Sequence, residues 1–228
     1  MTHRFFSACR IGLAAIGLAF VCSNAHAQAD DLTTRLSAEQ QKWDRIQYEA
    51  PAADREAALK ALAVTAAELV QTHPGRAEAH TWLGIALASE GRANGGLGVL
   101  TVVRQARDAF EKARGIDPKV MGGAVYYGLG GLYANVPRWP IGFGDKERAK
   151  TLFKEAIAVS PDGLDSNYYY ADFLIAQKRP KEARPYLERA LQAPLRAGRE
   201  LADNGRRAKV RQMLREVPPN VAVKPAPR

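Results

Sequence analysis

Few residues of this chain could carry out chemistry, and their spacing forms no catalytic or metal-binding arrangement. Both cysteines, Cys9 and Cys22, lie within the first 27 residues, and only two histidines, His73 and His80, lie beyond them. Neither an HExxH motif nor an acid–histidine cluster with metal-ligand spacing accompanies these histidines. No serine lies in a G-x-S-x-G motif. We therefore expect no catalytic residue, no metal and no cofactor, and we expect His80 to be a packed core side chain.

A glycine-rich stretch, GRANGGLG at 91–98, has the composition of a phosphate-binding loop but not its motif. It lacks the closing Gly-Lys-Ser/Thr, and it follows a helical pattern rather than a strand. The stretch is therefore predicted to be a flexible loop between two helices.

The first 27 residues have the order of a secretory signal peptide. Arg4 and Arg10 give a positive start, an apolar run of about 12 residues follows at 11–22, and small residues precede the expected cleavage site after Ala27. The run is shorter than the ~20 residues that a transmembrane helix needs. We expect cleavage and export to a bacterial periplasm, and an uncut N-terminal anchor is the alternative. Cleavage removes both cysteines, so packing without disulfides must stabilise the mature chain.

The net charge of +9 is concentrated near the end of the chain. Residues 195–228 hold nine basic and three acidic residues, whereas residues 28–194 hold 22 basic and 21 acidic residues. A nucleic-acid-binding protein spreads basic residues over a folded face, so we expect no nucleic-acid partner. The basic segment is predicted to form a solvated capping helix, and contact with an anionic membrane surface is the alternative.

Two spacing patterns recur, and both follow one face of a helix. The first places a small residue, Gly84, Gly130 or Ala171, directly after one large residue and three positions before another. The second runs alanine, a large residue four later, alanine three later and then a proline that ends the helix. Matches to the first pattern lie at 80–87, 126–133 and 167–174, and matches to the second lie at 106–118, 149–161 and 183–194. Each pair of patterns predicts two helices that approach closely at the small residues, and a weaker match lies at 62–74.

These residues resemble the tetratricopeptide repeat, whose pattern is W-x2-L-G-x2-Y, A-x3-F and then proline. His80, Tyr126 and Asn167 replace the opening tryptophan, and the first two units carry about 10 and 7 extra residues between their helices. The resemblance implies an all-α solenoid of stacked antiparallel helix hairpins with a C-terminal capping helix. The segments 136–149, 160–174 and 201–210 also look like periplasmic repeat proteins related to the T component of some TRAP-type transporters. That resemblance implies a binding accessory protein and not an enzyme.

The expected organisation follows from these patterns. A signal peptide (1–27) and an N-terminal helix region (28–51) precede the repeats (52–194). The repeats comprise a weak half repeat (52–74) and units at about 76–118, 120–161 and 165–194, followed by a capping helix (195–217) and a disordered proline-rich tail (218–228).

Repeat arithmetic predicts which residues face the concave groove of the solenoid. Three residues before each small residue lie Thr81, Tyr127 and Tyr168, and one residue after it lie Ile85, Gly131 and Asp172. Tyrosines offer a large area with few rotamers to freeze, although they could instead pack within the stack. We expect a protein or peptide partner in an open groove; a deep closed apolar pocket would favour the alternative, a small-molecule carrier or transporter accessory protein.

The inserted loop 136–145 carries two large apolar residues, Trp139 and Phe143, at the expected surface. They could form a lid or rim over the groove beside Tyr127, or fold onto the helix ends and complete the core. Asp145 is predicted to cap the helix that follows.

Overall fold

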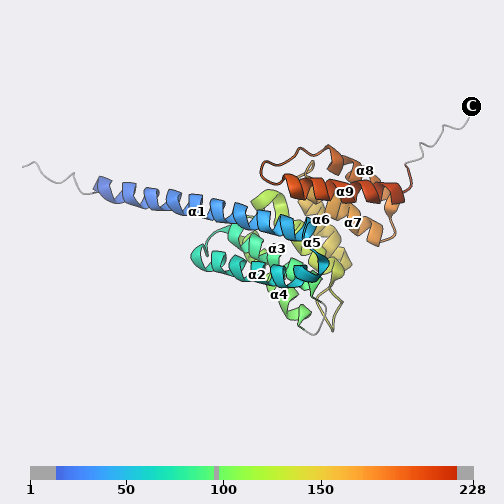
Figure 1. Ribbon diagram of the computed structural model, residues 1–228, viewed down its shortest axis with the longest axis horizontal. Helices are drawn as coiled ribbons and strands as arrows, with labels where there is room; N and C mark the ends of the chain where they lie inside the picture. The colour runs from blue at the N-terminus through green and yellow to red at the C-terminus, as the bar shows by residue number, and fades with distance from the viewer. Residues whose placement is uncertain (1–13, 95–97, 220–228) are drawn as a thin grey trace, which may run out of the picture.

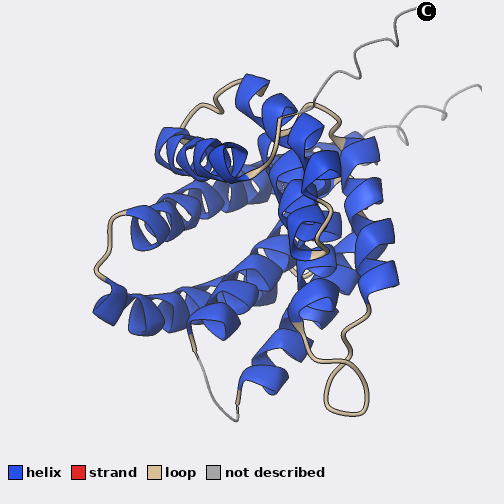
Figure 2. Cartoon of the chain, turned by 90° about the vertical axis from the view of Figure 1, so that its right-hand side faces the viewer, coloured by secondary structure: helices blue, strands red, loops and turns tan. Residues whose placement is uncertain are grey.

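Helices form all the regular structure in residues 14–94 and 98–219, which the computed structural model describes (Figures 1 and 2). The expected all-α solenoid is confirmed for this part of the chain. The helices are α1 (Ala14–Tyr48), α2 (Ala52–Thr72), α3 (Ala77–Ala93), α4 (Val99–Ile116), α5 (Val120–Asn135), α6 (Lys146–Val159), α7 (Leu164–Ala176), α8 (Pro180–Gln192) and α9 (Glu200–Glu216). Within the described residues, none of these helices combines the length and apolar character that crossing a membrane requires.

Successive helices pair into hairpins, which stack on one another. The pairs α3–α4, α5–α6 and α7–α8 make extensive contacts, and α2 packs against both α1 and α3. Helix α5 also contacts α3 and α7 directly, so the first helices of these three hairpins lie side by side. Their shared face is the inner face of the solenoid.

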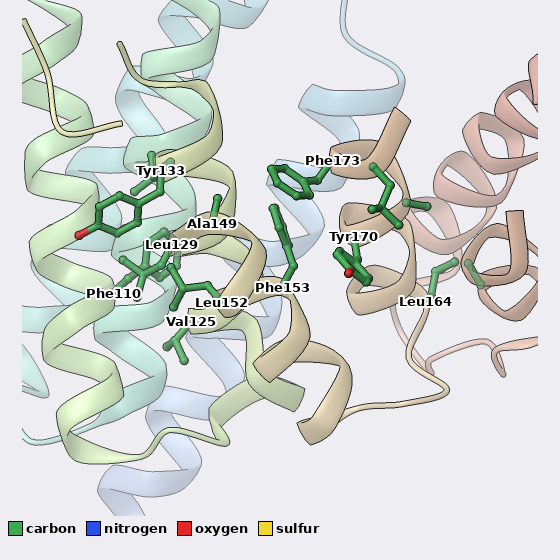
Figure 3. Packing of buried hydrophobic residues seen from close by; sticks show 14 of the residues in the cluster. Phe110, Val125, Leu129, Tyr133, Ala149, Leu152, Phe153, Leu164, Tyr170 and Phe173 are labelled. Atoms are coloured by element: carbon green, nitrogen blue, oxygen red, sulfur yellow. The ribbon is translucent and has the colours of Figure 1, made fainter. Parts of the chain in front are cut away.

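Glycines allow these helices to approach closely, and Phe110 and Phe153 fill the space beside them within the buried core (Figure 3). A Cβ atom on Gly84 would lie 2.7 Å from the Phe110 ring, and one on Gly128 would lie 2.4 Å from it. A Cβ on Gly130 would lie 3.0 Å from the Phe153 ring. Each phenylalanine thus fills space that only a residue without a side chain leaves open.

Helix α9 does more than cover the last hairpin. It contacts α7 and α8, and it also contacts α1, which lies beside it in Figure 1. Val210 and Val217 are buried in the same core cluster as Leu187 of α8. The C-terminal helix therefore packs on the last hairpin and also reaches the first helix.

Several expected segments fall outside the described residues. These are the first part of the signal peptide (1–13), residues 95–97 of the glycine-rich stretch and residues 220–228 of the tail. Residues 14–27 form the beginning of α1.

Candidate functional site

Two adjoining chambers occupy the inner face, and together we call them the inner cavity. The large chamber has a volume of about 510 Å³ and the small chamber about 250 Å³. The residues that line both are Trp43 of α1, Ile85 of α3, Tyr127 of α5, Tyr169 of α7 and Arg206 of α9. Helices from both ends of the chain therefore contribute to the wall of one cavity.

Aromatic side chains form much of the wall. The Tyr127 ring stacks on Tyr169 with 5.0 Å between centroids, and Tyr168 meets Tyr169 edge to face at 5.1 Å. The Trp43 indole donates a hydrogen bond to Ser89 Oγ at 2.9 Å, which leaves its ring as an apolar surface. The wall is open at Gly131, because no atom lies within 4 Å of where its Cβ would be.

Arg206 joins α9 to α7 at the boundary between the chambers. Its Nε donates to Asp165 Oδ1 at 3.1 Å, and its Nη2 donates to the Tyr169 hydroxyl at 3.0 Å. The guanidinium also lies 4.2 Å from the Tyr168 ring centroid and 4.7 Å from that of Tyr169. Burial alone would raise the pKa of Asp165, but the charges of Arg206 and Arg196 outweigh burial and lower it.

Two further arginines before α9 are each paired with an aspartate. Arg199 donates to both carboxylate oxygens of Asp44 on α1, at 2.8 and 2.9 Å. Arg196 pairs with Asp203, and it pairs with Asp165 at 2.9 Å. The arginines that line the small chamber are therefore neutralised by carboxylates of the protein.

The large chamber has a different charge balance. Arg92 of α3 and Lys209 of α9 line it, and so does one acid, Asp172 of α7. Among the described residues, neither cation has a carboxylate oxygen within 4.0 Å, whereas the arginines of the small chamber do. Burial lowers the pKa of Lys209, and the nearby charges of Arg206 and Arg92 lower it further. Burial raises the pKa of Asp172 in spite of the surrounding cations.

Five of the six residues predicted to line the groove do line the inner cavity, and these are Ile85, Tyr127, Gly131, Tyr168 and Asp172. Tyr127, Tyr168 and Asp172 come together there, with Tyr127 and Tyr168 brought into one aromatic cluster by Tyr169. Their part in binding stays a prediction.

Thr81, which the repeat spacing places on the groove, does not line the inner cavity. The prediction is therefore wrong for this residue of the first unit. The Thr81 side chain is 0% exposed, and its hydroxyl donates to the Ala77 carbonyl at 2.8 Å. The physical reason is that threonine has a short side chain, which here bonds back to its own helix. The long side chains of Tyr127 and Tyr168 at the same position of the later units reach the inner cavity.

The loop 136–145 reaches the large chamber through Val136 and Pro137. Neither Trp139 nor Phe143 lines the inner cavity, so these two side chains form no lid over it. Trp139 is 85% exposed. Phe143 is half-buried, edge to face with Tyr133 at 5.4 Å and under the Arg107 guanidinium at 4.8 Å. The core-completing alternative thus describes Phe143 but not Trp139. Asp145 caps α6 by accepting hydrogen bonds from two backbone N–H groups.

Other residues of the cavity were missed by sequence reasoning. Trp43, Arg92, Tyr169, Arg206 and Lys209 line the large chamber. One usable signal was present, because Arg199, Asp203 and Arg206 are four and three residues apart and share one helix face. Nothing in the local sequence indicated that this face turns inward.

His80, possible metal ligands and the groove between α1 and α2 are weaker candidates for chemistry or binding than the inner cavity. His80 is buried, and its Nε2 lies 2.8 Å from the Pro74 carbonyl oxygen. Among the described residues, no group of three or more His, Cys, Asp or Glu could hold a metal ion. A groove of about 510 Å³ between α1 and α2 is lined by alanines, Ile46, Leu62, Thr65 and charged side chains, without an aromatic residue.

Comparisons with known proteins agree with this architecture. The tetratricopeptide repeat model matches residues 141–196. The thermophilic TPR protein TTC0263 of Thermus thermophilus has a similar structure, with a TM-score of 0.52 and 19% identity over 68% of this chain and 73% of that chain. PilF of Pseudomonas aeruginosa matches over 84% of this chain and 95% of that chain at 16% identity, and its TM-score of 0.32 supports no argument. No curated protein matches the chain. Residues 141–196 thus match the tetratricopeptide repeat, and the fold is similar to that of the thermophilic tetratricopeptide-repeat protein.

Proposed function

We propose that this protein is an exported, non-catalytic binding protein that holds a short segment of a protein partner in the inner cavity. The observation that carries the proposal is the cluster of Tyr127, Tyr168 and Tyr169 around an open space on the inner face. Solenoids of this kind present their inner face to partners. Aromatic side chains supply much of the binding energy at such surfaces.

The size of the cavity limits what it can hold. The large chamber, at about 510 Å³, lies within the ~300–1,000 Å³ range of ligand sites. Because Arg206 and Lys209 of α9 line the large chamber, it fits a short chain end or a single side-chain group better than a long extended peptide.

A second candidate function is the carriage of a small molecule, as a carrier or a transporter accessory protein. The contacts of α9 favour it, because Arg206 ties this helix to α7 and Arg199 ties the segment before it to α1, so both ends of the chain contribute to the wall of the cavity. Export rests on the signal-peptide pattern of residues 1–27, which indicates a periplasmic location.

A matched pair of glycine substitutions tests whether the cavity is the binding site. Gly131→Phe should fill the large chamber without a clash, because nothing lies within 4 Å of the position of its Cβ. Gly115→Phe on α4 is the control, since its Cβ also meets nothing within 4 Å and it does not line the cavity. Both variants should fold with unchanged circular dichroism.

The readout is capture from a periplasmic extract, with mass spectrometry of both the proteins and the small molecules that are retained. We expect Gly131→Phe to lose a retained species that the wild type and Gly115→Phe both keep. Loss of a protein supports the first function, and loss of a small molecule supports the second. Identical capture by all three proteins would exclude the inner cavity as the site.

A further inference from the structure

We propose that the large chamber binds a carboxylate that is attached to an apolar or aromatic body. The carboxylate would lie between Arg92 and Lys209, and the body would lie among the aromatic side chains. This inference rests on the proposed function of the cavity as a binding site, and it names the chemistry of the ligand.

The charge balance of the large chamber is the first argument. Arg92, Lys209 and Arg206 line it, and Arg55 is close enough to act on Lys209. Arg206 is already paired with Asp165. The single lining acid, Asp172, lies near three of these cations. Like charges gathered on one wall repel each other, so an anion that enters the chamber is attracted and relieves that repulsion.

The distribution of ion pairs places the anion in the large chamber and not in the small one. Asp44, Asp165 and Asp203 already hold Arg199, Arg206 and Arg196, so an anion in the small chamber would have to displace a protein carboxylate. Arg92 and Lys209 have no such partner within 4.0 Å among the described residues. They can therefore donate charge-assisted hydrogen bonds to an incoming carboxylate.

The apolar wall supplies the second argument. The half-buried side chains of Ile85, Val99, Leu100 and Val136 line the large chamber together with its tyrosines. A small inorganic anion would leave this surface in contact with water, whereas an apolar body attached to the carboxylate would cover it. The chamber therefore fits an amphipathic organic anion better than phosphate or sulfate.

Two sources could supply this chemistry: a free organic acid, or the C-terminus of a peptide whose last residue is apolar. Isothermal titration calorimetry with four probes separates them. The probes are octanoate, 1-octanol, a pentapeptide Ala-Ala-Ala-Ala-Phe with a free C-terminus, and the same peptide with a C-terminal amide. We expect at least one acid to bind and its uncharged counterpart to bind at least tenfold more weakly. Whichever acid binds more tightly identifies the source.

Charge substitutions locate the carboxylate. Arg92→Gln and Lys209→Gln should each weaken binding of the acid about tenfold, because each removes a hydrogen bond to a charged group. Lys154→Gln is the control, since Lys154 is exposed on α6 and does not line the cavity. Arg92→Lys should retain part of the affinity, and thermal unfolding should show that all four variants are folded.

The outcomes separate this inference from the proposed function. Equal binding of acids and uncharged counterparts, or unchanged binding by Arg92→Gln and Lys209→Gln, would overturn the inference. If neither acid binds while Gly131→Phe still abolishes capture from the extract, the cavity is a binding site and only its ligand class is wrong. If octanoate or the peptide binds Gly131→Phe as tightly as the wild type, the binding site lies elsewhere and both proposals fail.

Discussion

At the scale of single residues, the inner face is organised by arginines that are held between carboxylates and aromatic rings. Arg206 is 7% exposed and contacts Asp165, Tyr168 and Tyr169 together. A buried guanidinium needs such partners because the cost of removing its charge from water is large. The tyrosines are therefore fixed in place by the same residue that ties α9 to α7.

Asp165→Asn tests the stabilising effect of this arrangement. The substitution leaves Arg206 buried without its carboxylate, so we expect the free energy of unfolding at pH 7 to fall by about 3–5 kcal/mol. Asp162→Asn is the control, because Asp162 is exposed three residues earlier, and it should change the value by less than about 0.5 kcal/mol. Urea unfolding measures both changes.

The difference in the free energy of unfolding between the wild type and Asp165→Asn should depend on pH in a definite direction. The arginines lower the pKa of Asp165 below its usual 3.8 in the folded chain, even though burial opposes them. A carboxyl group of this kind stabilises the fold above its unfolded pKa, and this contribution is lost as the pH falls through the folded pKa. The wild type and Asp165→Asn should therefore differ less at pH 3 than at pH 7. An equal difference at both values would show that the ion pair is not its origin.

At the scale of elements, the repeat spacing predicts the hairpins because each pattern is local. The small residue and the phenylalanine that fills its gap are set by sequence spacing, as in Gly130 and Phe153. The spacing gives the direction of a side chain but not its reach, which is why Thr81 is predicted on the groove and is in fact buried. The contact between α9 and α1 cannot be predicted from local spacing either, because Arg199 and Asp44 are 155 residues apart.

In the loop 136–145, Phe143 is packed and Trp139 is exposed. The free energies of unfolding of their alanine variants measure this difference. Phe143→Ala removes contacts with Tyr133 and Arg107, so we expect it to lower the free energy of unfolding by about 1–3 kcal/mol. Trp139→Ala should change it by less than about 0.5 kcal/mol, since Trp139 is 85% exposed. Urea unfolding of the two single variants tests this, and equal destabilisation would show that the tryptophan packs as well.

At the scale of the whole molecule, the two ends of the solenoid are joined directly. The Arg199–Asp44 ion pair connects the segment before α9 to α1, and Trp43 brings α1 into the wall of the inner cavity. A linear stack of repeats has contacts only between neighbours, whereas this chain adds a contact between its first and last helices. The inner cavity exists because of that closure, so binding and global stability should depend on the same residues.

The part of α1 that serves this closure begins after the predicted signal peptide. The first half of α1 projects away from the hairpins in Figure 1. The core of the first hairpin includes Leu32 and Leu36 of α1, both of which follow Ala27. We therefore expect that protein recovered from the periplasm begins at Gln28, and that a chain starting at Gln28 has the same melting temperature as the full-length protein.

A chain that starts at Glu39 is compared with the chain that starts at Gln28. Starting at Glu39 removes Leu32 and Leu36, whose burial stabilises the fold by about 1.5–3 kcal/mol each. This chain should therefore melt well below the chain that starts at Gln28. N-terminal sequencing and differential scanning calorimetry give the two readouts. Recovery of intact Met1 in the cytoplasm would refute export. A lower melting temperature for the chain that starts at Gln28 would show that residues before Gln28 help hold α1 against the repeats.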